Sequence, residues 1–217
     1  MFSMNSASKM LSERLAGALR SRSGKGGSNH PGQVRQSSAL ESPALHWCGM
    51  GAGFTIREFR RTDFPRLWEI DQKCFPPGIS YSQMELLIYI RRPRAFTLVA
   101  ERAGNGAGSG ATPDGDAVGF VVAEVEGRQT GHIITIDVLE EARRSGLGSS
   151  LISAAEQRLK ERGCQRVLLE TAVDNAAAMA FYKRHQYFVL KTVPRYYSTG
   201  VDAFVLKKDL LLPGSGG

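Results

Sequence analysis

The chain has 217 residues, and 42% of them are apolar, which is enough for one domain of ordinary size with a real core. Its three cysteines are too few and too scattered for a disulfide framework or a zinc site, so we expect a reducing, cytoplasmic location. No apolar run approaches the roughly 18 residues that a membrane-spanning helix needs, and no membrane association is expected. The formal net charge of +7 is shared between residues 1–53 and a remainder in which basic and acidic residues are mixed, so no nucleic-acid-binding face is predicted.

The first part of the chain differs in composition from the rest. Residues 1–53 are rich in Ser, Gly and Pro and lack apolar periodicity, so they cannot bury enough surface to offset the entropy lost on ordering. We expect a disordered or weakly structured extension there, one domain over residues 54–210 and a flexible tail over 211–217. A flexible tail, or an over-long start with initiation near Met50, is favoured over an organellar transit peptide.

From residue 54 onward the apolar pattern predicts regular elements. Alternation over residues 54–59 indicates a strand, and helical spacing over 62–75 and 80–92 indicates two helices, the first with a Thr62/Asp63 start signal and the second with Ser82 as its N-cap. A polar, glycine-rich hairpin connection is expected over 103–116. The other expected elements are strands over 95–102, 117–127, 131–139, 166–173, 187–193 and 202–210, and helices over 148–162 and 175–185.

This element order, β-α-α-β-β-β-α-β-α-β-β, predicts an α/β protein of the α+β type. Hairpin connections alternate with helical crossovers, so the sheet should be mixed, mostly antiparallel and flanked by helices.

The stretch EEARRSGLGSSL, residues 140–151, places two arginines and two glycines immediately before a helix. The beginning of a helix offers backbone N–H groups without partners and a partial positive charge, and glycines let an anion approach the backbone closely. The arginines add donors suited to phosphate oxygens, so a diphosphate fits this turn. Neither the Walker loop nor the Rossmann turn matches, since Leu151 stands where the third Rossmann glycine would be. The alternative is a tight strand-to-helix turn whose arginines are merely solvated.

Three segments in order, HIITIDVLEEARRSGLGSSL, LLETAVDNAAAMAFYKRHQYF and RYYSTGVDAF, resemble the GCN5-related N-acetyltransferases, and within them the RimI-type protein N-terminal acetyltransferases. The resemblance covers about residues 54–210. It implies the GNAT fold, acetyl-CoA as cosubstrate, no metal and no covalent acyl-enzyme. The implied reaction is direct attack, in a ternary complex, by the N-terminal α-amine of a protein or peptide, with a ribosomal protein as one candidate. A monomer or weak dimer is expected.

The resemblance also implies which residues bind the coenzyme. The backbone of the strand before the turn would bond the pantetheine arm, and the turn would hold the diphosphate. An ordinary core strand, and a helix cap at Asn175, are the alternatives for two of these segments. The implied coenzyme-binding residues are Ile136, Asp137, Val138, Arg143, Arg144, Ser145, Gly146, Leu147, Gly148, Ser149, Asn175 and Tyr182.

Two residues are expected to be catalytic. Glu170 interrupts an apolar strand, where a carboxylate is costly unless it is paired or functional, and the resemblance makes it the base for the amine, directly or through water. A structural ion pair with an arginine is the alternative. Tyr182 lies two helical turns after Asn175, which places both residues on one face of the helix. The resemblance makes Tyr182 the acid that protonates the leaving thiolate, and a core tyrosine is the alternative.

The acceptor site and the reaction class rest on the same resemblance. Covering the edge of the core is the alternative role of the implied substrate-binding residues. Three residues depart from the family pattern: Gln186, Ala172 and Ala142. Gln186 stands where a glycine with positive φ is usual, which implies strain or a different turn. Acetylation of a small amine or a lysine side chain, and a non-catalytic acyl-CoA-binding module, are the alternative functions. The implied substrate-binding residues are Phe75, Pro76, Tyr81, Tyr196 and Tyr197.

Overall fold

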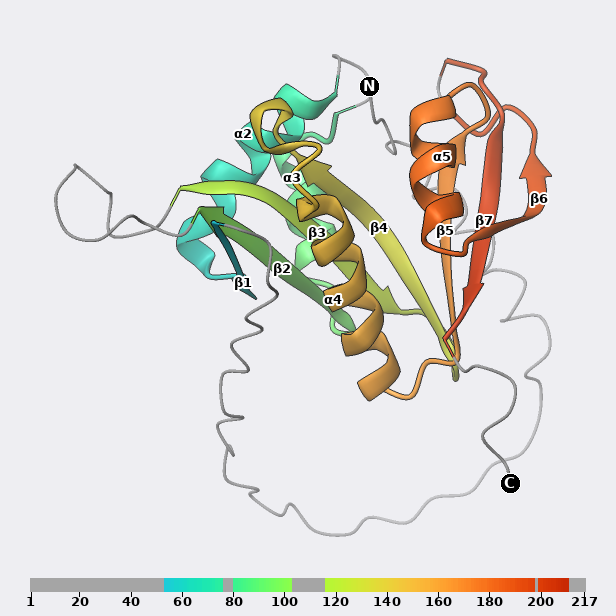
Figure 1. Cartoon of the computed structure of the whole chain (residues 1–217), viewed down its shortest axis with the longest axis horizontal. Coiled ribbons are helices and arrows are strands. Elements are labelled where there is room, and N and C mark those ends of the chain that lie inside the picture. The colour runs from blue at the N-terminus through green and yellow to red at the C-terminus, as the bar shows by residue number, and fades with distance from the viewer. Residues whose placement is uncertain (1–52, 76–79, 103–115, 198, 211–217) are drawn as a thin grey trace, which may run out of the picture.

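The computed structural model describes residues 53–75, 80–102, 116–197 and 199–210. These residues form a seven-stranded sheet with strand order β1-β2-β3-β4-β5-β7-β6 and flanking helices (Figure 1). The observed order of strands and α-helices is the predicted one. Its elements are β1 (Phe54–Glu58), the short 3-10 helix η1 (Arg61–Asp63), α2 (Phe64–Cys74), α3 (Gln83–Ile90), β2 (Ala95–Arg102), β3 (Ala117–Val125), β4 (Thr130–Val138), the 3-10 helix η2 (Glu140–Ala142), α4 (Leu147–Glu161), β5 (Arg166–Ala172), α5 (Ala176–Arg184), β6 (Phe188–Val193) and β7 (Ala203–Asp209).

Strand β3 lies in the middle of the antiparallel half of the sheet, and every residue of it is buried. Helix α4 packs against β2, β3 and β4, while α2 packs against β3 and β4. Figure 1 shows α4 on the near face of the sheet and α2 and α3 on the far face. A strand covered on both faces needs apolar residues at successive positions, which explains the run AVGFVVAEV.

The expected helix start signals are used in two different ways. Ser82 caps α3 in a reciprocal arrangement, because its Oγ accepts from the Glu85 amide at 3.3 Å and the Glu85 carboxylate accepts from the Ser82 amide at 3.1 Å. Asp63 precedes α2, but its side chain makes no cap hydrogen bond to that helix. Its carboxylate accepts instead from the Arg57 guanidinium and from the Arg60 amide. The Thr62/Asp63 signal therefore marks the helix start without capping α2.

The sheet opens between β4 and β5. These parallel strands pair only near their beginnings, from Thr130 opposite Arg166 to His132 opposite Leu168. Beyond that point β4 stays paired with β3, and β5 stays paired with β7. The β3 partners of β4 skip Ile134, which is the extra residue of a β-bulge and changes the alternation of side chains along β4.

The turn after α5 keeps its left-handed geometry although no glycine is present. Gln186 has a φ of 66°, and the Tyr187 amide donates to the Tyr182 carbonyl across this turn at 3.0 Å. The strain expected at this position is therefore present, and the turn is not rebuilt. Helix α4 ends more conventionally, with Gly163 at a φ of 83°.

Several expectations fall outside the described residues. They are the extension before Gly53, most of the 103–116 connection, the 211–217 tail and Pro76. Within the described part of the chain, no helix is long and apolar enough to cross a membrane.

Candidate active site

The turn before α4 has the backbone shape that an anion cradle requires. Arg144 and Gly146 are both left-handed, with φ of 60° and 87°, and Gly146 is the N-cap residue of α4. The helix begins at Leu147, one residue earlier than expected. Gly146 has no side chain to cap it, and the Ser145 hydroxyl accepts from the Leu147 amide at 3.4 Å. The amides of Gly148 and Ser149 have no carbonyl one turn earlier inside the helix, so they can donate to a bound anion.

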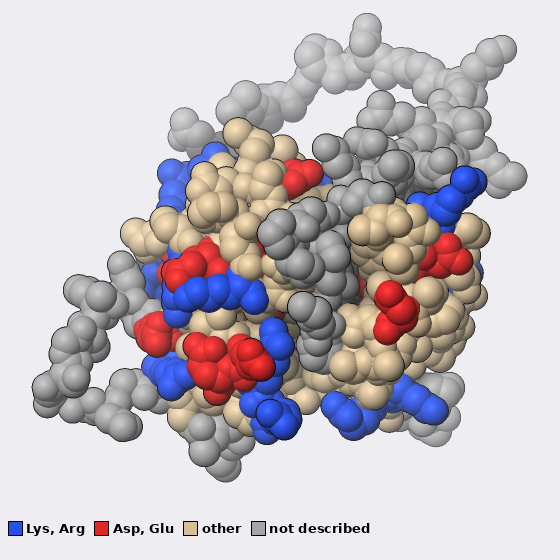
Figure 2. All heavy atoms as spheres, turned by 90° about the horizontal axis from the view of Figure 1, so that it is seen from above, with Lys and Arg blue, Asp and Glu red and all other residues tan. Residues whose placement is uncertain are grey.

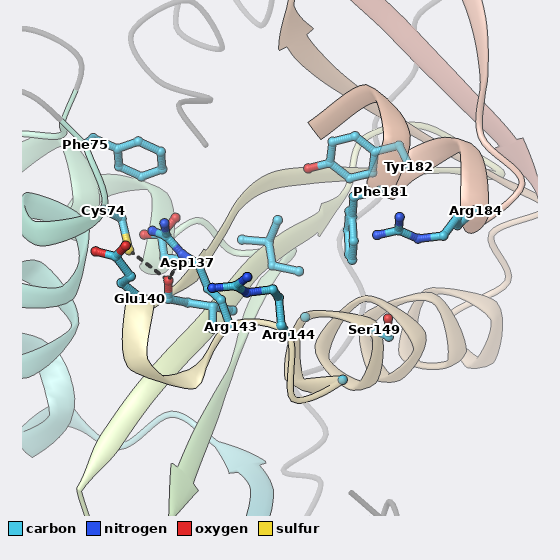
Figure 3. Close-up of a pocket in the computed structure, with 14 residues that line it drawn as sticks. Cys74, Phe75, Asp137, Glu140, Arg143, Arg144, Ser149, Phe181, Tyr182 and Arg184 are labelled. Atoms are coloured by element: carbon cyan, nitrogen blue, oxygen red, sulfur yellow. Dashed lines mark hydrogen bonds between the residues drawn. The ribbon is translucent and has the colours of Figure 1, made fainter. Parts of the chain in front are cut away.

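A cavity of about 500 Å³ runs from this turn along the end of β4 to α5 (Figure 3). It is lined by many of the residues that sequence reasoning assigned to the coenzyme, and also by Phe75 from the expected substrate set. Cys74, Glu140, Phe181 and Arg184 line it as well, and sequence reasoning missed them. The expected coenzyme residues that line it are Ile136, Asp137, Val138, Arg143, Arg144, Gly146, Gly148, Ser149 and Tyr182.

The two arginines of the turn lie differently. The Arg143 side chain turns back toward β4, where its Nε donates to the Val138 carbonyl at 2.9 Å. The Cys74 thiol donates to the same oxygen at 3.4 Å. Burial raises the pKa of this thiol to about 12, so it is protonated near neutral pH. Arg144 is exposed at the cavity mouth.

Three expected coenzyme residues do not line the cavity. The Ser145 hydroxyl donates to the Ala142 carbonyl at 2.7 Å and so stabilises the turn. Leu147 is buried in the core. Asn175 is the N-cap of α5, where its Oδ1 accepts from the Ala178 amide at 3.0 Å. The cap role considered for Asn175 is thus the one that its side-chain oxygen performs.

Ser149 connects the cradle to α5. Its hydroxyl lies 3.0 Å from Nε2 of His185, the C-cap residue of α5. Burial lowers the pKa of His185, which favours the neutral ring near pH 7.

Tyr182 projects from α5 into the cavity, as Figure 3 shows, although only 1% of it is exposed to solvent. Its ring packs edge-on against Phe181 and Tyr187. Burial raises the pKa of the phenol, with further contributions from Tyr197, Asp137 and Glu170. The hydroxyl is therefore protonated and can act as a donor at any physiological pH.

Glu170 forms a buried pair with a histidine. Its Oε2 lies 2.7 Å from Nε2 of His132, and both side chains are almost entirely buried. Burial alone would lower the pKa of His132, but the neighbouring Glu170 carboxylate outweighs this and raises it to about 9. The structural ion pair considered from the sequence therefore exists, with a histidine in place of an arginine. Glu170 does not line the cavity, although its charge acts on the Tyr182 phenol.

His132 is a site residue that sequence reasoning missed. In the sequence it is a histidine in a strand that also carries Thr135 and Asp137, and no local pattern indicates its pairing with Glu170.

The expected substrate tyrosines are buried, and none of the three lines the cavity. Tyr81 packs on Tyr89 with ring centroids 5.2 Å apart, and Tyr196 packs on Tyr197 at the same separation. In the part of the chain that the structure describes, the hydroxyls of Tyr81, Tyr196 and Tyr197 are buried and have no hydrogen-bond partner. These rings contribute to packing, and their assignment to the substrate stays a prediction.

Charge is mixed on the surface around these elements. Figure 2 shows basic and acidic side chains side by side on the face seen from above, not a continuous basic area. Among the described residues, no group of three or more His, Cys, Asp or Glu could hold a metal ion.

Comparisons with known proteins bear on the fold and the family. A family model described as the acetyltransferase (GNAT) family matches residues 64–187, more than half of the chain. An N-alpha-acetyltransferase of Sulfurisphaera tokodaii is 27% identical over 172 residues, which cover 74% of this chain and 95% of the relative. The crystal structure of Ard1 from Thermoplasma volcanium has a TM-score of 0.64 at 28% identity and covers 74% of this chain and 100% of that chain.

A more distant structure bears on the RimI resemblance. The ribosomal-protein-S18-alanine N-acetyltransferase from Escherichia coli has a TM-score of 0.61 at 22% identity and covers 76% of this chain and 98% of that chain. A likeness at this identity shows the fold alone. The expected fold is confirmed. The relatives described above include N-alpha-acetyltransferases outside the RimI type, so the RimI type itself is not shown.

Proposed function

Because the chain belongs to the acetyltransferase (GNAT) family, we propose that this enzyme transfers the acetyl group of acetyl-CoA to the N-terminal α-amine of a protein or peptide. The observation that carries the proposal is the cavity, which joins the glycine turn of α4 to Tyr182 along the free end of β4. One end of this cavity suits a diphosphate and the other suits a reacting thioester. We place the reaction in the cytoplasm and expect a monomer or weak dimer.

The coenzyme would be held by hydrogen bonds to the protein backbone and by the negative charge of its diphosphate. The amides of Gly148 and Ser149 would bind the diphosphate together with Arg144, which also lines the cavity. The open edge of β4 leaves the backbone of Ile136 and Val138 facing the cavity, where the pantetheine arm can bind as an added strand would. Arg143 and Cys74 bond the Val138 carbonyl and help fix this strand end.

The chemistry follows from the groups that meet at the thioester. The neutral amine attacks the carbonyl carbon, the carbon–sulfur bond breaks, and the sulfur takes a proton from Tyr182. Burial keeps that tyrosine protonated, and the same burial makes a departing thiolate more basic than it is in water. The Glu170–His132 pair would receive the proton that the amine loses, directly or through water. An α-amine suits this chemistry because its ordinary pKa of about 7.7 to 8.0 leaves a useful neutral fraction near pH 7.

The test is mass spectrometry of peptides incubated with acetyl-CoA. Peptides with free N-termini should gain one acetyl group on the α-amine, whereas the same peptides with blocked N-termini should not. An alanine-initiated peptide from a ribosomal protein belongs in the set, because the Escherichia coli structural neighbour is named for such a substrate. Acetylation of lysine side chains or small amines alone would contradict the proposal. Coenzyme A binding without any acetyl product would indicate a binding module.

Variants test the assigned roles. Tyr182→Phe and Glu170→Gln should each lower kcat by roughly 10²- to 10⁴-fold, the usual contribution of a general acid or base. Tyr187→Phe is the matched control, since Tyr187 is also a buried tyrosine but does not line the cavity. Equal kcat values for the Tyr182 and Tyr187 variants would remove Tyr182 from the mechanism.

A further inference from the structure

Strand β4 carries an ionisable side chain into the cavity at the place where the thioester is expected. Asp137 lies between Ile136 and Val138, lines the cavity and is 1% exposed (Figure 3). Its Oδ1 accepts from the Thr135 hydroxyl at 2.7 Å. Its Oδ2 is buried and has no hydrogen-bond partner in the described ranges of the chain. A buried polar atom without a partner is costly, so Oδ2 is placed for a ligand that the free protein lacks.

The surroundings of Asp137 indicate the charge of that ligand. Burial raises the pKa of Asp137 well above its ordinary value, and the charge of Asp71 on α2 raises it further, while Thr135 and Arg143 act in the opposite direction. Asp71 is itself fully buried, and its Oδ2 accepts from the Tyr81 amide at 2.8 Å. Two carboxyl groups in one poorly solvated region disfavour a second negative charge, so a cation is the ligand that would ionise Asp137.

The fold places the Asp137 carboxyl group on the face of the sheet that also carries the Glu170–His132 pair. The β3 partners of His132 and Thr135 are Glu124 and Val122, two positions apart and so on one face of β3. The bulge at Ile134 therefore puts His132, Thr135 and Asp137 on the same face of β4. Asp137 thus shares a face with the Glu170–His132 pair, and it lies close enough to Tyr182 for an ionised Asp137 to raise the pKa of that phenol.

We propose that Asp137 is a specificity-determining residue that binds the incoming acceptor amine as its ammonium ion. This inference rests on the proposed acetyl transfer to an amine. On binding, the protonated carboxyl group releases its proton to solvent, and the carboxylate pairs with the ammonium group. The Glu170–His132 pair then takes one proton from the ammonium group, directly or through water, and the neutral nitrogen attacks the thioester carbon. The site therefore selects acceptors that are cationic at neutral pH over neutral hydroxyl compounds of the same shape.

The experiment compares an alanine-initiated peptide with an analogue that has a hydroxyl group in place of the α-amine. Binding of each to the protein loaded with coenzyme A is measured by calorimetry, with Asp137→Asn as the test variant. This substitution keeps the size of the side chain and an oxygen for Thr135, but it removes the charge. Glu141→Gln is the control, because it removes an exposed carboxylate outside the cavity from the nearby η2 turn.

The wild type and the Glu141 variant should bind the amine peptide at least tenfold more tightly than the hydroxyl analogue. Asp137→Asn should abolish that preference and raise the KM for the peptide at least tenfold, while its affinity for coenzyme A stays within about twofold. A preserved preference in Asp137→Asn would overturn the inference.

Two further readouts keep the inference testable on its own. If the Asn variant does not fold, the wild type alone can overturn the inference by showing no preference for the amine peptide. Calorimetry in buffers of different ionisation enthalpy measures proton release, and amine binding without proton release would also overturn the inference. Failure of the proposed function looks different, because the wild type would then make no acetyl product whatever its binding preference.

Discussion

Replacing Gly146 with alanine should weaken coenzyme A binding far more than it weakens the fold, and Gly163→Ala supplies a matched control. The two glycines flank the same helix, with φ of 87° and 83°, and a Cβ added at either would meet no atom within 4 Å. Forcing alanine into the left-handed region costs about 1–2 kcal/mol, and reduced freedom of the unfolded chain returns about 0.4–1 kcal/mol. Each variant should therefore lose roughly 1 kcal/mol of unfolding free energy.

The two variants should separate in their affinity for coenzyme A. Gly146 lines the cavity beside the first amides of α4, whereas Gly163 lies at the other end of the helix. A methyl group at position 146 would hold a phosphate away from these amides. The loss of one hydrogen bond to a charged group costs about 1.5–3 kcal/mol. We expect a roughly ten- to hundredfold weaker Kd for Gly146→Ala and less than a twofold change for Gly163→Ala.

Urea unfolding and isothermal titration calorimetry with coenzyme A measure the two quantities on the same preparations. Equal coenzyme affinities in the two variants, with equal losses of stability, would refute the idea that the diphosphate approaches the backbone at this turn. A much larger loss of stability in one variant would refute the strain argument.

Two further predictions concern stability. Gln186→Gly should raise the unfolding free energy by roughly 0.5–1 kcal/mol, because it relieves left-handed strain at a φ of 66°, and an unchanged urea midpoint would contradict this. Glu170 raises the pKa of His132 from 6.5 to about 9, so between these pH values the folded protein binds more protons than the unfolded chain. The stabilisation by the pair is therefore complete below about pH 6.5 and is lost as the pH rises through about 9. Unfolding measured between pH 6.5 and 9 should show a decline of up to about 3 kcal/mol that His132→Gln abolishes, and an identical decline in that variant would count against the pair.

The elements could be predicted from the sequence because each has a local cause. Ser82 lies three residues before Glu85, and the reciprocal cap forms. Gln186 keeps the left-handed turn that a glycine usually occupies, because the turn bond between Tyr187 and Tyr182 constrains the backbone whatever the side chain. Backbone geometry of this kind depends on a few consecutive residues, which a sequence pattern can represent.

The candidate site was less predictable because its contacts join distant segments. Glu170 stood out as a carboxylate in an apolar strand, but its partner, His132, lies on the neighbouring strand and has no local signature. Arg143 was expected at the diphosphate, whereas its Nε bonds the Val138 carbonyl, an interaction that depends on how the turn folds back on β4. Asp137 was assigned to the coenzyme through its backbone, and only the structure shows an orphaned carboxylate oxygen in the cavity.

The opening between β4 and β5 connects these observations. A strand released from one neighbour exposes backbone groups that a pantetheine arm can bond, which explains why the cavity follows Ile136 and Val138. The bulge at Ile134 then turns Asp137 toward the face that holds the Glu170–His132 pair. Without the bulge the alternation of side chains would continue, and Asp137 would point to the opposite face. One inserted residue in β4 thus decides whether the reaction site holds a carboxyl group beside the acceptor amine.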